Sequence, residues 1–280
     1  MMNLWYALWD ALPFEIFHWR FMQNALLAIL LMAPLLGLSS TMVVTGKMSF
    51  FSDALGHSAF TGIAIGAICG IHNPTIVSVL FAIFFSLLFS FLRSRRNLPA
   101  DTLIGVFSST AVALGIFIAT LNGSSFTKFN KYLIGDILSV SPGEIGLLAC
   151  ALAVTLLFWI LLSNQLLLSS IYPQLASSRR IPVQLIQTIF TTAIAVIVTL
   201  SISWVGLLIL NSLLVLPAAA ARNIAKNVKE YHSLSVIFAL VAGLLGLFLS
   251  YYLGASAGAA ISLVLAVLFA LSMLLKRVRS

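Results

Sequence analysis

Residues 143–163 read GEIGLLACALAVTLLFWILLS, and the one charged side chain in this stretch is that of Glu144, near its start. About 20 consecutive apolar residues are needed for a helix to cross a hydrocarbon layer ~30 Å thick. In lipid, every backbone polar group must find its hydrogen-bond partner within the protein, so a run of this kind is expected to be helical. The stretch therefore predicts a membrane-spanning helix.

Eight further apolar runs surround this one. The chain has 280 residues, of which 61% are hydrophobic and 8% charged, against about 25% charged residues in a soluble domain. We predict an all-α integral membrane protein, a single transmembrane domain over residues 1–280 with an interfacial segment at 1–20. It would be a polytopic bundle of nine helices, or eight if one of the two adjoining runs after residue 182 is too short to cross. The nine runs are 21–44, 50–71, 74–92, 101–121, 143–163, 183–202, 204–221, 231–253 and 258–275.

The positive charge of the chain follows the membrane pattern. Its net charge is +8, with 15 Lys and Arg residues, and these lie in short clusters between the apolar runs, which argues against a nucleic-acid partner. With nine spans, all but Arg20, Lys128 and Lys131 fall on one side, and the positive-inside rule places the N-terminus outside and the C-terminus in the cytoplasm. The twelve residues on the inner side are Lys47, Arg93, Arg95, Arg96, Arg179, Arg180, Arg222, Lys226, Lys229, Lys276, Arg277 and Arg279.

One carboxylate, that of Asp53, lies well inside an apolar run. Such a residue costs about 2.5–3.5 kcal/mol at a helix centre, and ionisable residues inside membranes commonly mark functional sites. His57 follows four positions later, a spacing that places both side chains on one helical face, and Thr61 continues the spacing. We therefore predict a polar line of carboxylate, imidazole and hydroxyl. The neighbouring face carries small residues that let helices approach closely, namely Ala54, Ser58, Gly62, Gly66 and Gly70.

Two interpretations of the Asp53 and His57 pair are open. In the first, the two side chains pair with each other, or Asp53 caps the start of its helix just inside the cytoplasmic surface. In the second, they bind a divalent metal, because imidazole nitrogen and carboxylate oxygen suit zinc, manganese or ferrous iron. One chain supplies two such ligands, and two copies about a twofold axis would supply the four that zinc prefers.

Polar residues also lie in the middle of the run at 204–221. Asn211 and Ser212 need hydrogen-bond partners at that depth. Either they line the same path as the Asp53 and His57 pair, or they form an interhelical hydrogen bond worth ~0.6 kcal/mol in typical cases.

Two connections are longer than a simple turn. In the first, 122–142, the stretch from Tyr132 to Val140 predicts a short helix at the membrane surface. The second, 164–182, lies on the inner side and predicts a short amphipathic element that a soluble partner can bind. Its candidate contact residues are Tyr172, Pro173, Gln174, Leu175, Ala176, Ser177, Arg179 and Arg180.

The chain contains no Gly-x-x-x-x-Gly-Lys-Ser/Thr phosphate loop, so it is not expected to hydrolyse ATP by that route. Active transport would then draw its energy from a partner or from an ion gradient. A gradient-driven carrier, in which Asp53 and His57 relay protons, is one alternative function. A membrane-embedded metal hydrolase is another, but it would need a third ligand and a general base, and no second carboxylate lies well inside the apolar runs.

Five short blocks, in the same order, resemble the permease subunits of bacterial ATP-binding-cassette importers for zinc, manganese and iron. The resemblance covers most of the chain. Its most specific block is MSFFSDALGHS at 48–58, which is similar to a Met-Ser, Asp and His signature of the family. The others are DTLIG at 101–105, YLIGDIL at 132–138, VGLL at 205–208 and LPAAAAR at 216–222.

The resemblance implies a type II-like importer permease in a bacterial cytoplasmic membrane, closest in appearance to zinc-uptake permeases, and a transport subunit rather than an enzyme. It implies a homodimer, or a pair of similar permeases, with two cytoplasmic ATPase subunits that bind ATP and an extracytoplasmic metal-binding protein. Asp53 and His57 match the family pair in the metal path. Zn²⁺ is the first expected substrate, because two His and two Asp make a tetrahedral site, with Mn²⁺ next and Fe²⁺ third. A permease for a large chelate such as haem, a siderophore or a cobalamin is a further alternative, although it would need a wide, largely apolar cavity.

The segment 164–182 is similar in position to the coupling helix that docks on the ATPase in this family. That helix usually carries an acidic residue, an alanine and a glycine in sequence. Ala176 matches the alanine, whereas residues 172–174 contain no acid and Arg180 occupies the position of the glycine.

Overall fold

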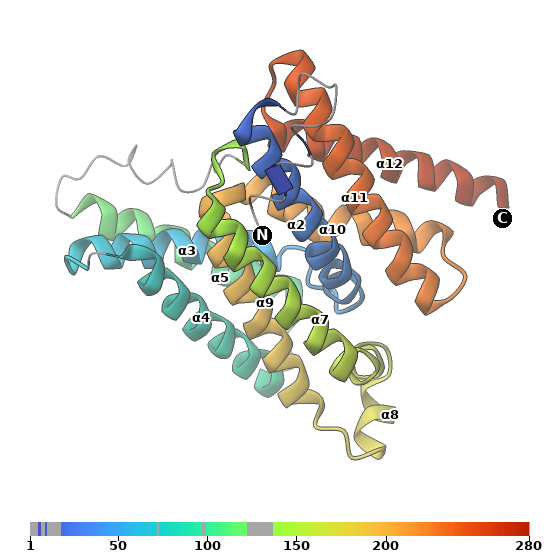
Figure 1. The fold of residues 1–280 in the computed structure, drawn as a ribbon. Coiled ribbons are helices and arrows are strands. Elements are labelled where there is room, and N and C mark those ends of the chain that lie inside the picture. The colour runs from blue at the N-terminus through green and yellow to red at the C-terminus, as the bar shows by residue number, and fades with distance from the viewer. Residues whose placement is uncertain are drawn as a thin grey trace. The chain divides into compact units, whose positions relative to one another are not determined.

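Long helices make up most of the chain in the computed structural model, which describes residues 5–6, 9, 18–71, 73–96, 99–121 and 137–279 (Figure 1). Within these ranges there is no β-strand, and two short elements, η2 (Ile137–Ser139) and α8 (Pro173–Ser178), lie between long helices. The long helices are α2 (Arg20–Thr45), α3 (Phe51–Ile68), α4 (Pro74–Arg96), α5 (Ala100–Thr120), α7 (Pro142–Ile171), α9 (Val183–Val205), α10 (Leu207–Ile224), α11 (Val228–Leu253) and α12 (Ala257–Arg279).

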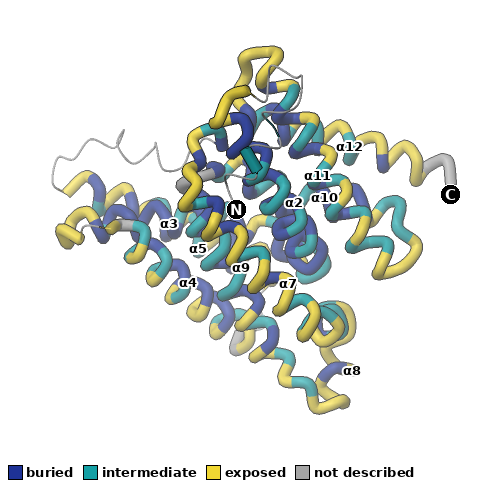
Figure 2. The backbone as a smooth tube through the Cα atoms, in the orientation of Figure 1, coloured by how far each residue is buried: buried dark blue, intermediate teal, exposed yellow. Residues whose placement is uncertain are grey.

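Of the helices within the described ranges, 8 are long and apolar enough to cross a membrane. The long helix outside this set is α3, in which Asp53 and His57 lower the mean hydropathy. Exposed residues recur along α4, α7 and α12 (Figure 2), and many are large and apolar, such as Leu80 and Ile160. The predicted all-helical membrane fold is thus confirmed, with eight spans by composition and α3 as the candidate for a ninth.

The helix ends agree with the predicted runs to within a few residues, with one exception. Helix α7 continues to Ile171, so the first half of the predicted inner connection at 164–182 is helical rather than a loop. The close junction after 202 is a single residue, Gly206, whose φ of 86° lies in the left-handed region that glycine adopts without strain. Residues 122–136 of the predicted outer connection lie outside the described ranges.

The helices pack into two compact units. The first comprises residues 1–41, 136–157 and 204–280, and the second residues 42–135 and 158–203, so that α2, α7 and α9 each contribute to both. In the first unit, α11 meets α12 closely, since a Cβ at Gly246 would lie 2.6 Å from the Cα of Ile261. On α2, the Oγ of Ser40 lies 3.0 Å from that of Ser235 on α11. Parts of the N-terminal segment also pack here, as the Trp5 indole donates to the Gln23 carbonyl.

In the second unit, α3 packs against both α4 and α5. A Cβ at Gly62 would lie 2.5 Å from the Cα of Ser78 on α4, and the Ser78 hydroxyl donates to the carbonyl of Ala59 at 2.9 Å. On the α5 side, a Cβ at Gly115 would lie 2.6 Å from the ring of Phe60. The small-residue face predicted for α3 therefore contains one of its closest helix contacts, at Gly62.

Candidate functional site

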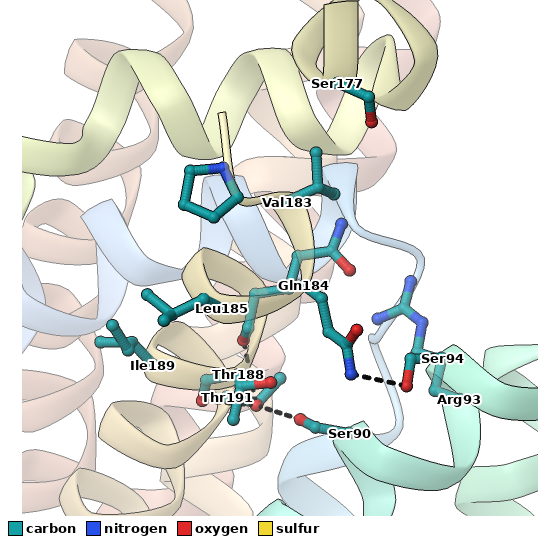
Figure 3. A pocket seen from close by; sticks show the side chains of 12 residues that line it. Ser90, Arg93, Ser94, Ser177, Val183, Gln184, Leu185, Thr188, Ile189 and Thr191 are labelled. Atoms are coloured by element: carbon teal, nitrogen blue, oxygen red, sulfur yellow. Dashed lines mark hydrogen bonds between the residues drawn. The ribbon is translucent and has the colours of Figure 1, made fainter. Parts of the chain in front are cut away.

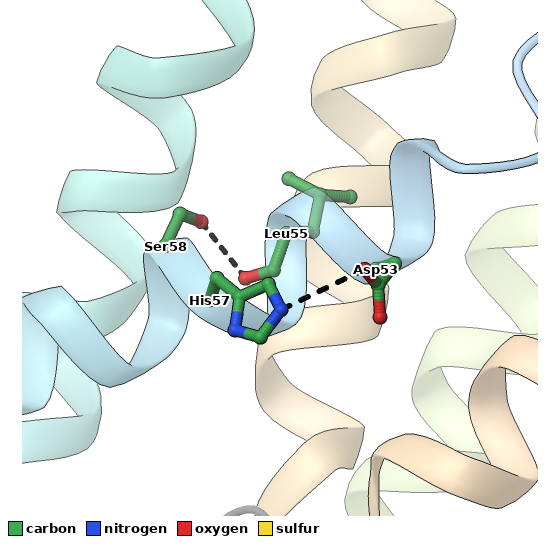
Figure 4. Close-up of polar contacts among 4 residues, drawn as sticks. All are labelled: Asp53, Leu55, His57 and Ser58. Carbon is green, nitrogen blue, oxygen red and sulfur yellow. Dashed lines mark hydrogen bonds and ion pairs between the residues drawn. The ribbon is translucent and has the colours of Figure 1, made fainter. Parts of the chain in front are cut away.

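Helix α3 carries Asp53 in its first turn and His57 one turn later. A carboxylate in the first turn is stabilised by the positive end of the helix dipole. The His57 Nε2 lies 3.6 Å from the Asp53 Oδ2, and the side chains are 31% and 44% exposed, respectively (Figure 4). The predicted pairing of the two residues on one helical face is therefore present in the structure.

The separation of the two ligand atoms suits a shared metal ion. At 3.6 Å the contact is longer than a hydrogen bond. Two ligand atoms that each lie ~2.1 Å from a tetrahedral ion are about 3.4 Å apart. The pair could therefore hold one cation through Nε2 and Oδ2 with a small adjustment of either side chain.

The rest of α3 is packed closely around this pair. Most of its residues are buried, including Ser52, Ala54, Gly56 and Ser58, which flank the two side chains in sequence. Asp53 and His57 are thus held by a tightly packed helix while their polar groups stay accessible. Such a helix offers the fixed geometry that a selective ligand pair needs.

Thr61 faces α5 rather than extending the polar line. Its hydroxyl donates to the carbonyl of Ala111 on α5 at 2.6 Å, and it also lies 3.1 Å from the His57 carbonyl. The physical reason is the helical repeat: each step of four residues advances by about 40°, so Thr61 is rotated by about 80° from Asp53. Its hydroxyl joins α3 to α5, and a place for it on a transport path stays a prediction.

Among the residues that the structure describes, no group of three or more His, Cys, Asp and Glu side chains could hold a metal ion. Within this part of the chain, Asp53 and His57 bring two such ligands together, as the sequence indicated.

Asn211 and Ser212 lie on α10, in the first unit, whereas Asp53 and His57 lie in the second. The Ser212 hydroxyl donates to the Leu208 carbonyl and lies 2.7 Å from the Ser262 Oγ on α12. One interpretation of Asn211 and Ser212 was an interhelical hydrogen bond, and Ser212 forms such a bond with Ser262. A role for Asn211 and Ser212 in lining a path stays a prediction.

The inner connection contains α8, which is exposed almost throughout. Every residue from 171 to 180 is exposed except Ala176, which is fully buried. Tyr172 is 62% exposed and Leu175 is 46% exposed. The segment thus presents an aromatic, an aliphatic and two arginine side chains to its surroundings while one alanine anchors it.

Arg180 ends α8 in a conformation that favours glycine. Its φ is 58°, and the N–H groups of Arg180 and Ile181 donate to the carbonyls of Ser177 and Ala176. These two bonds form a Schellman motif, in which the left-handed position is usually glycine. The glycine position inferred from the family resemblance therefore has a structural basis, although this chain has an arginine there.

We expect Arg180→Gly to stabilise the isolated chain by about 1 kcal/mol, because glycine adopts this φ without the Cβ clash. The measurement is thermal unfolding of the purified protein in detergent. Arg179→Gly is the matched control, since Arg179 has a φ of −85° that any residue tolerates. A midpoint for Arg180→Gly at or below that of the Arg179→Gly variant would contradict the assignment of strain.

Two features near the ends of α4 and α9 were not predicted as functional. The guanidinium of Arg93 donates to the Gly46 carbonyl at 3.3 Å and to the Met48 sulfur at 3.1 Å, which ties the end of α4 to the connection before α3. A polar seam also joins α4 to α9 through three side-chain pairs, Ser86 with Thr192, Ser90 with Thr191 and Ser94 with Gln184. The spacing of four residues between the three serines was a signal for this seam in the sequence.

A family model described as the ABC 3 transport family matches residues 18–276. The chain belongs to this family. The family resemblance inferred from the five sequence blocks is thereby confirmed, and this member of the ABC 3 family is a membrane transport subunit rather than an enzyme, with ATP hydrolysis in a separate subunit.

Relatives within the family align over nearly the whole chain. It is 30% identical over 250 residues to the high-affinity zinc uptake system membrane protein ZnuB of Haemophilus influenzae, covering 89% of this chain and 94% of that protein. It is 30% identical over 255 residues to the manganese import system permease protein ScaB of Streptococcus parasanguinis, covering 91% and 90%. Among solved structures, PsaBC from Streptococcus pneumoniae in complex with a Fab matches with a TM-score of 0.78 and 26% identity, covering 97% of this chain and 95% of that one.

Proposed function

We propose that the chain is the transmembrane subunit of an ATP-driven importer for a divalent transition metal, with Zn²⁺ as the first substrate, Mn²⁺ as the next and Fe²⁺ as a third. The observation that carries the proposal is the accessible pair of Asp53 and His57, whose ligand atoms lie 3.6 Å apart. Relatives named for zinc uptake and manganese import support the same substrate class.

In this proposal the metal pauses at the pair. Two copies of the chain, arranged as a homodimer, bring two carboxylates and two imidazoles to one ion, which gives zinc its four ligands. The exposure of both side chains lets the ion enter and leave, since transport needs binding that is strong enough to capture and weak enough to release. The pair then acts as a gate rather than as a storage site.

The partners follow from the proposed transport cycle. Two cytoplasmic ATPase subunits would bind ATP and move the α8 segments, and the permease pair would alternate between outward-facing and inward-facing states. An extracytoplasmic protein would deliver the metal. The basic residues of the sequence support an orientation in a bacterial cytoplasmic membrane with the N-terminus outside and the C-terminus in the cytoplasm.

Other functions are less well supported. A permease for a large metal chelate has no evident use for an ionisable pair with metal-ligand spacing. A membrane hydrolase would need a third ligand, and within the described ranges none lies with the pair. A gradient-driven carrier conflicts with membership in a family of ABC transport proteins.

The test is uptake of radioactive zinc and manganese into vesicles that contain the chain and its ATPase. We expect uptake that requires ATP, stops with a hydrolysis-deficient ATPase and continues after a protonophore collapses the proton gradient. The metal with the lower half-saturation concentration is the preferred substrate. Uptake that persists without ATP and stops with the protonophore would instead establish a gradient-driven carrier.

A further inference from the structure

The connection between α2 and α3 holds one residue in an unfavourable conformation. Lys47 has a φ of 55°, in the left-handed region that residues other than glycine adopt at a cost. The N–H groups of Lys47 and Met48 donate to the carbonyls of Val44 and Val43, so Lys47 occupies the position after α2 that is usually glycine. A strained residue of this kind persists where the structure around it fixes the backbone.

Arg93, near the end of α4, fixes this connection on both sides of Lys47. One guanidinium nitrogen donates to the Gly46 carbonyl at 3.3 Å, and another donates to the Met48 sulfur at 3.1 Å. Gly46 and Met48 flank Lys47 in the sequence. Because the planar guanidinium presents its N–H groups in a fixed geometry, a single side chain restrains both neighbours of the strained residue.

The restrained connection leads directly into the first turn of α3. The Met48 carbonyl accepts a hydrogen bond from the Phe51 N–H at 2.9 Å, and the Phe51 ring packs on that of Phe89 on α4, with ring centroids 4.9 Å apart. Phe89 lies one turn before Arg93, on the same face of α4. Two side chains of α4 thus hold the start of α3, and Asp53 lies in that first turn.

The two members of the metal-ligand pair lie at different distances from this restraint. His57 lies one turn further along α3, close to the contacts of Thr61 with α5 and of Gly62 with α4. Asp53 lies nearer to the helix start, where the first N–H groups have no partner within the helix and fraying begins. Movement of the connection would therefore shift the Asp53 carboxylate relative to the His57 imidazole.

Arg93 can be replaced without breaking a packed core. Its side chain lines a cavity of about 1000 Å³, next to the polar seam between α4 and α9 that includes Ser94 and Gln184 (Figure 3). Its two acceptors, the Gly46 carbonyl and the Met48 thioether, are uncharged. Methionine at position 93, which is unbranched and has no N–H donor, would remove both hydrogen bonds without leaving a partner charge unpaired.

We propose that Arg93 is a positioning residue for metal binding. Its guanidinium holds the connection at Gly46 and Met48 and thereby sets the separation of the Asp53 carboxylate from the His57 imidazole. The inference rests on the proposed function, in which these two side chains bind the metal. It adds a residue of α4 to the site, one that acts through the backbone of the connection and not by contact with the metal.

The test compares the native chain with Arg93→Met in uptake of radioactive zinc and manganese into vesicles, at equal amounts of assembled complex. We expect the half-saturation concentration of the preferred metal to rise about tenfold, as for loss of an outer-shell partner at a metal site. The maximal rate should stay within about twofold of native. Arg93→Lys should recover part of the affinity, since an ammonium group does not reproduce the fork of the guanidinium. A lower maximal rate at an unchanged half-saturation concentration would overturn the inference, as would native values for both.

A second substitution tests the link through Lys47. Glycine adopts the left-handed conformation without strain, so Arg93→Met should raise the half-saturation concentration much less in a Lys47→Gly background than in the native chain. Such a difference between backgrounds is the coupling expected of residues that act on one segment. An equal rise in both backgrounds would contradict the proposed restraint.

The control for lost charge is Lys229→Met, which removes an exposed positive charge from the start of α11 on the same predicted side of the membrane. Both kinetic values should stay native. A rise in half-saturation concentration equal to that of Arg93→Met would assign the effect to charge alone and overturn the inference.

Limited trypsin digestion gives a readout that does not depend on metal. Lys47 is exposed, and cleavage after it, identified from the fragment masses, should be faster in Arg93→Met than in the native chain. If cleavage is faster but the native chain takes up no metal, the restraint stands and the proposed function fails. If native uptake is normal and Arg93→Met changes neither cleavage nor half-saturation, the positioning role alone fails.

Discussion

Asp53→Ala and His57→Ala are each expected to reduce metal uptake at least about 100-fold. Loss of an outer-shell partner already costs metal sites about 10- to 100-fold, and each substitution removes a direct ligand from both copies of the proposed homodimer. The measurement is the initial rate of ATP-dependent zinc and manganese uptake into vesicles, compared at equal amounts of assembled complex.

The same variants should fold normally, which separates the metal role from a structural pairing. Both side chains are partly exposed, and an exposed ion pair contributes only about 0–1 kcal/mol to stability. Thermal unfolding midpoints and ATPase docking should therefore match the native chain. The control is Asp101→Asn, which removes an exposed carboxylate from the first turn of α5 and should leave uptake near native. If uptake by the Asp53 and His57 variants is also near native, the pair is structural and the path must be sought elsewhere, with Asn211 as the first candidate.

Gly62→Ala should destabilise the protein by about 1–3 kcal/mol, the usual cost of overpacking a closely packed contact. The new Cβ would lie 2.5 Å from the Cα of Ser78 and 3.1 Å from its backbone nitrogen. Because these are backbone atoms, no rotation of a side chain can relieve the clash, and α3 and α4 must separate. The measurement is the thermal unfolding midpoint in detergent, together with metal uptake.

Gly146→Ala on α7 is the matched control for this packing effect. A Cβ at Gly146 would meet no heavy atom within 4 Å, and alanine is the better helix former by roughly 1 kcal/mol. Its midpoint should equal or exceed that of the native chain. A Gly62→Ala midpoint at or above the native value would contradict the close α3–α4 contact.

The local parts of this architecture could be predicted from the sequence. Helix geometry alone brings residues four apart onto one face, so the contact between Asp53 and His57 followed from their spacing. The same geometry explains why Thr61 faces α5 and not the side of Asp53: after two steps of four residues, it is rotated by about 80° from Asp53. The lengths of the apolar runs predicted most helix ends to within a few residues. Helix α7 is the exception, because it continues through the polar residues Asn164 and Gln165 to Ile171. A helix can extend beyond the hydrocarbon layer, so the end of an apolar run does not have to be the end of the helix.

Contacts between distant segments could not be predicted in this way. Arg93 looked like one member of a charge cluster that sets orientation. Its partners, Gly46 and Met48, lie 47 and 45 residues away in the chain, and no local pattern indicates that the guanidinium reaches them. The left-handed conformation of Arg180 could likewise not be predicted from the residue itself, because arginine rarely adopts it. The one indication was that the related permeases usually have a glycine at this position.

The close contacts of α3 also limit how the proposed metal gate can move. Gly62 lies against the backbone of α4, and Gly115 of α5 lies against Phe60 and Thr61 of α3. Turning α3 about its own axis would drive side chains into both neighbours, so the direction in which His57 points is locked to α4 and α5. A change of access at the proposed gate would therefore displace these three helices together.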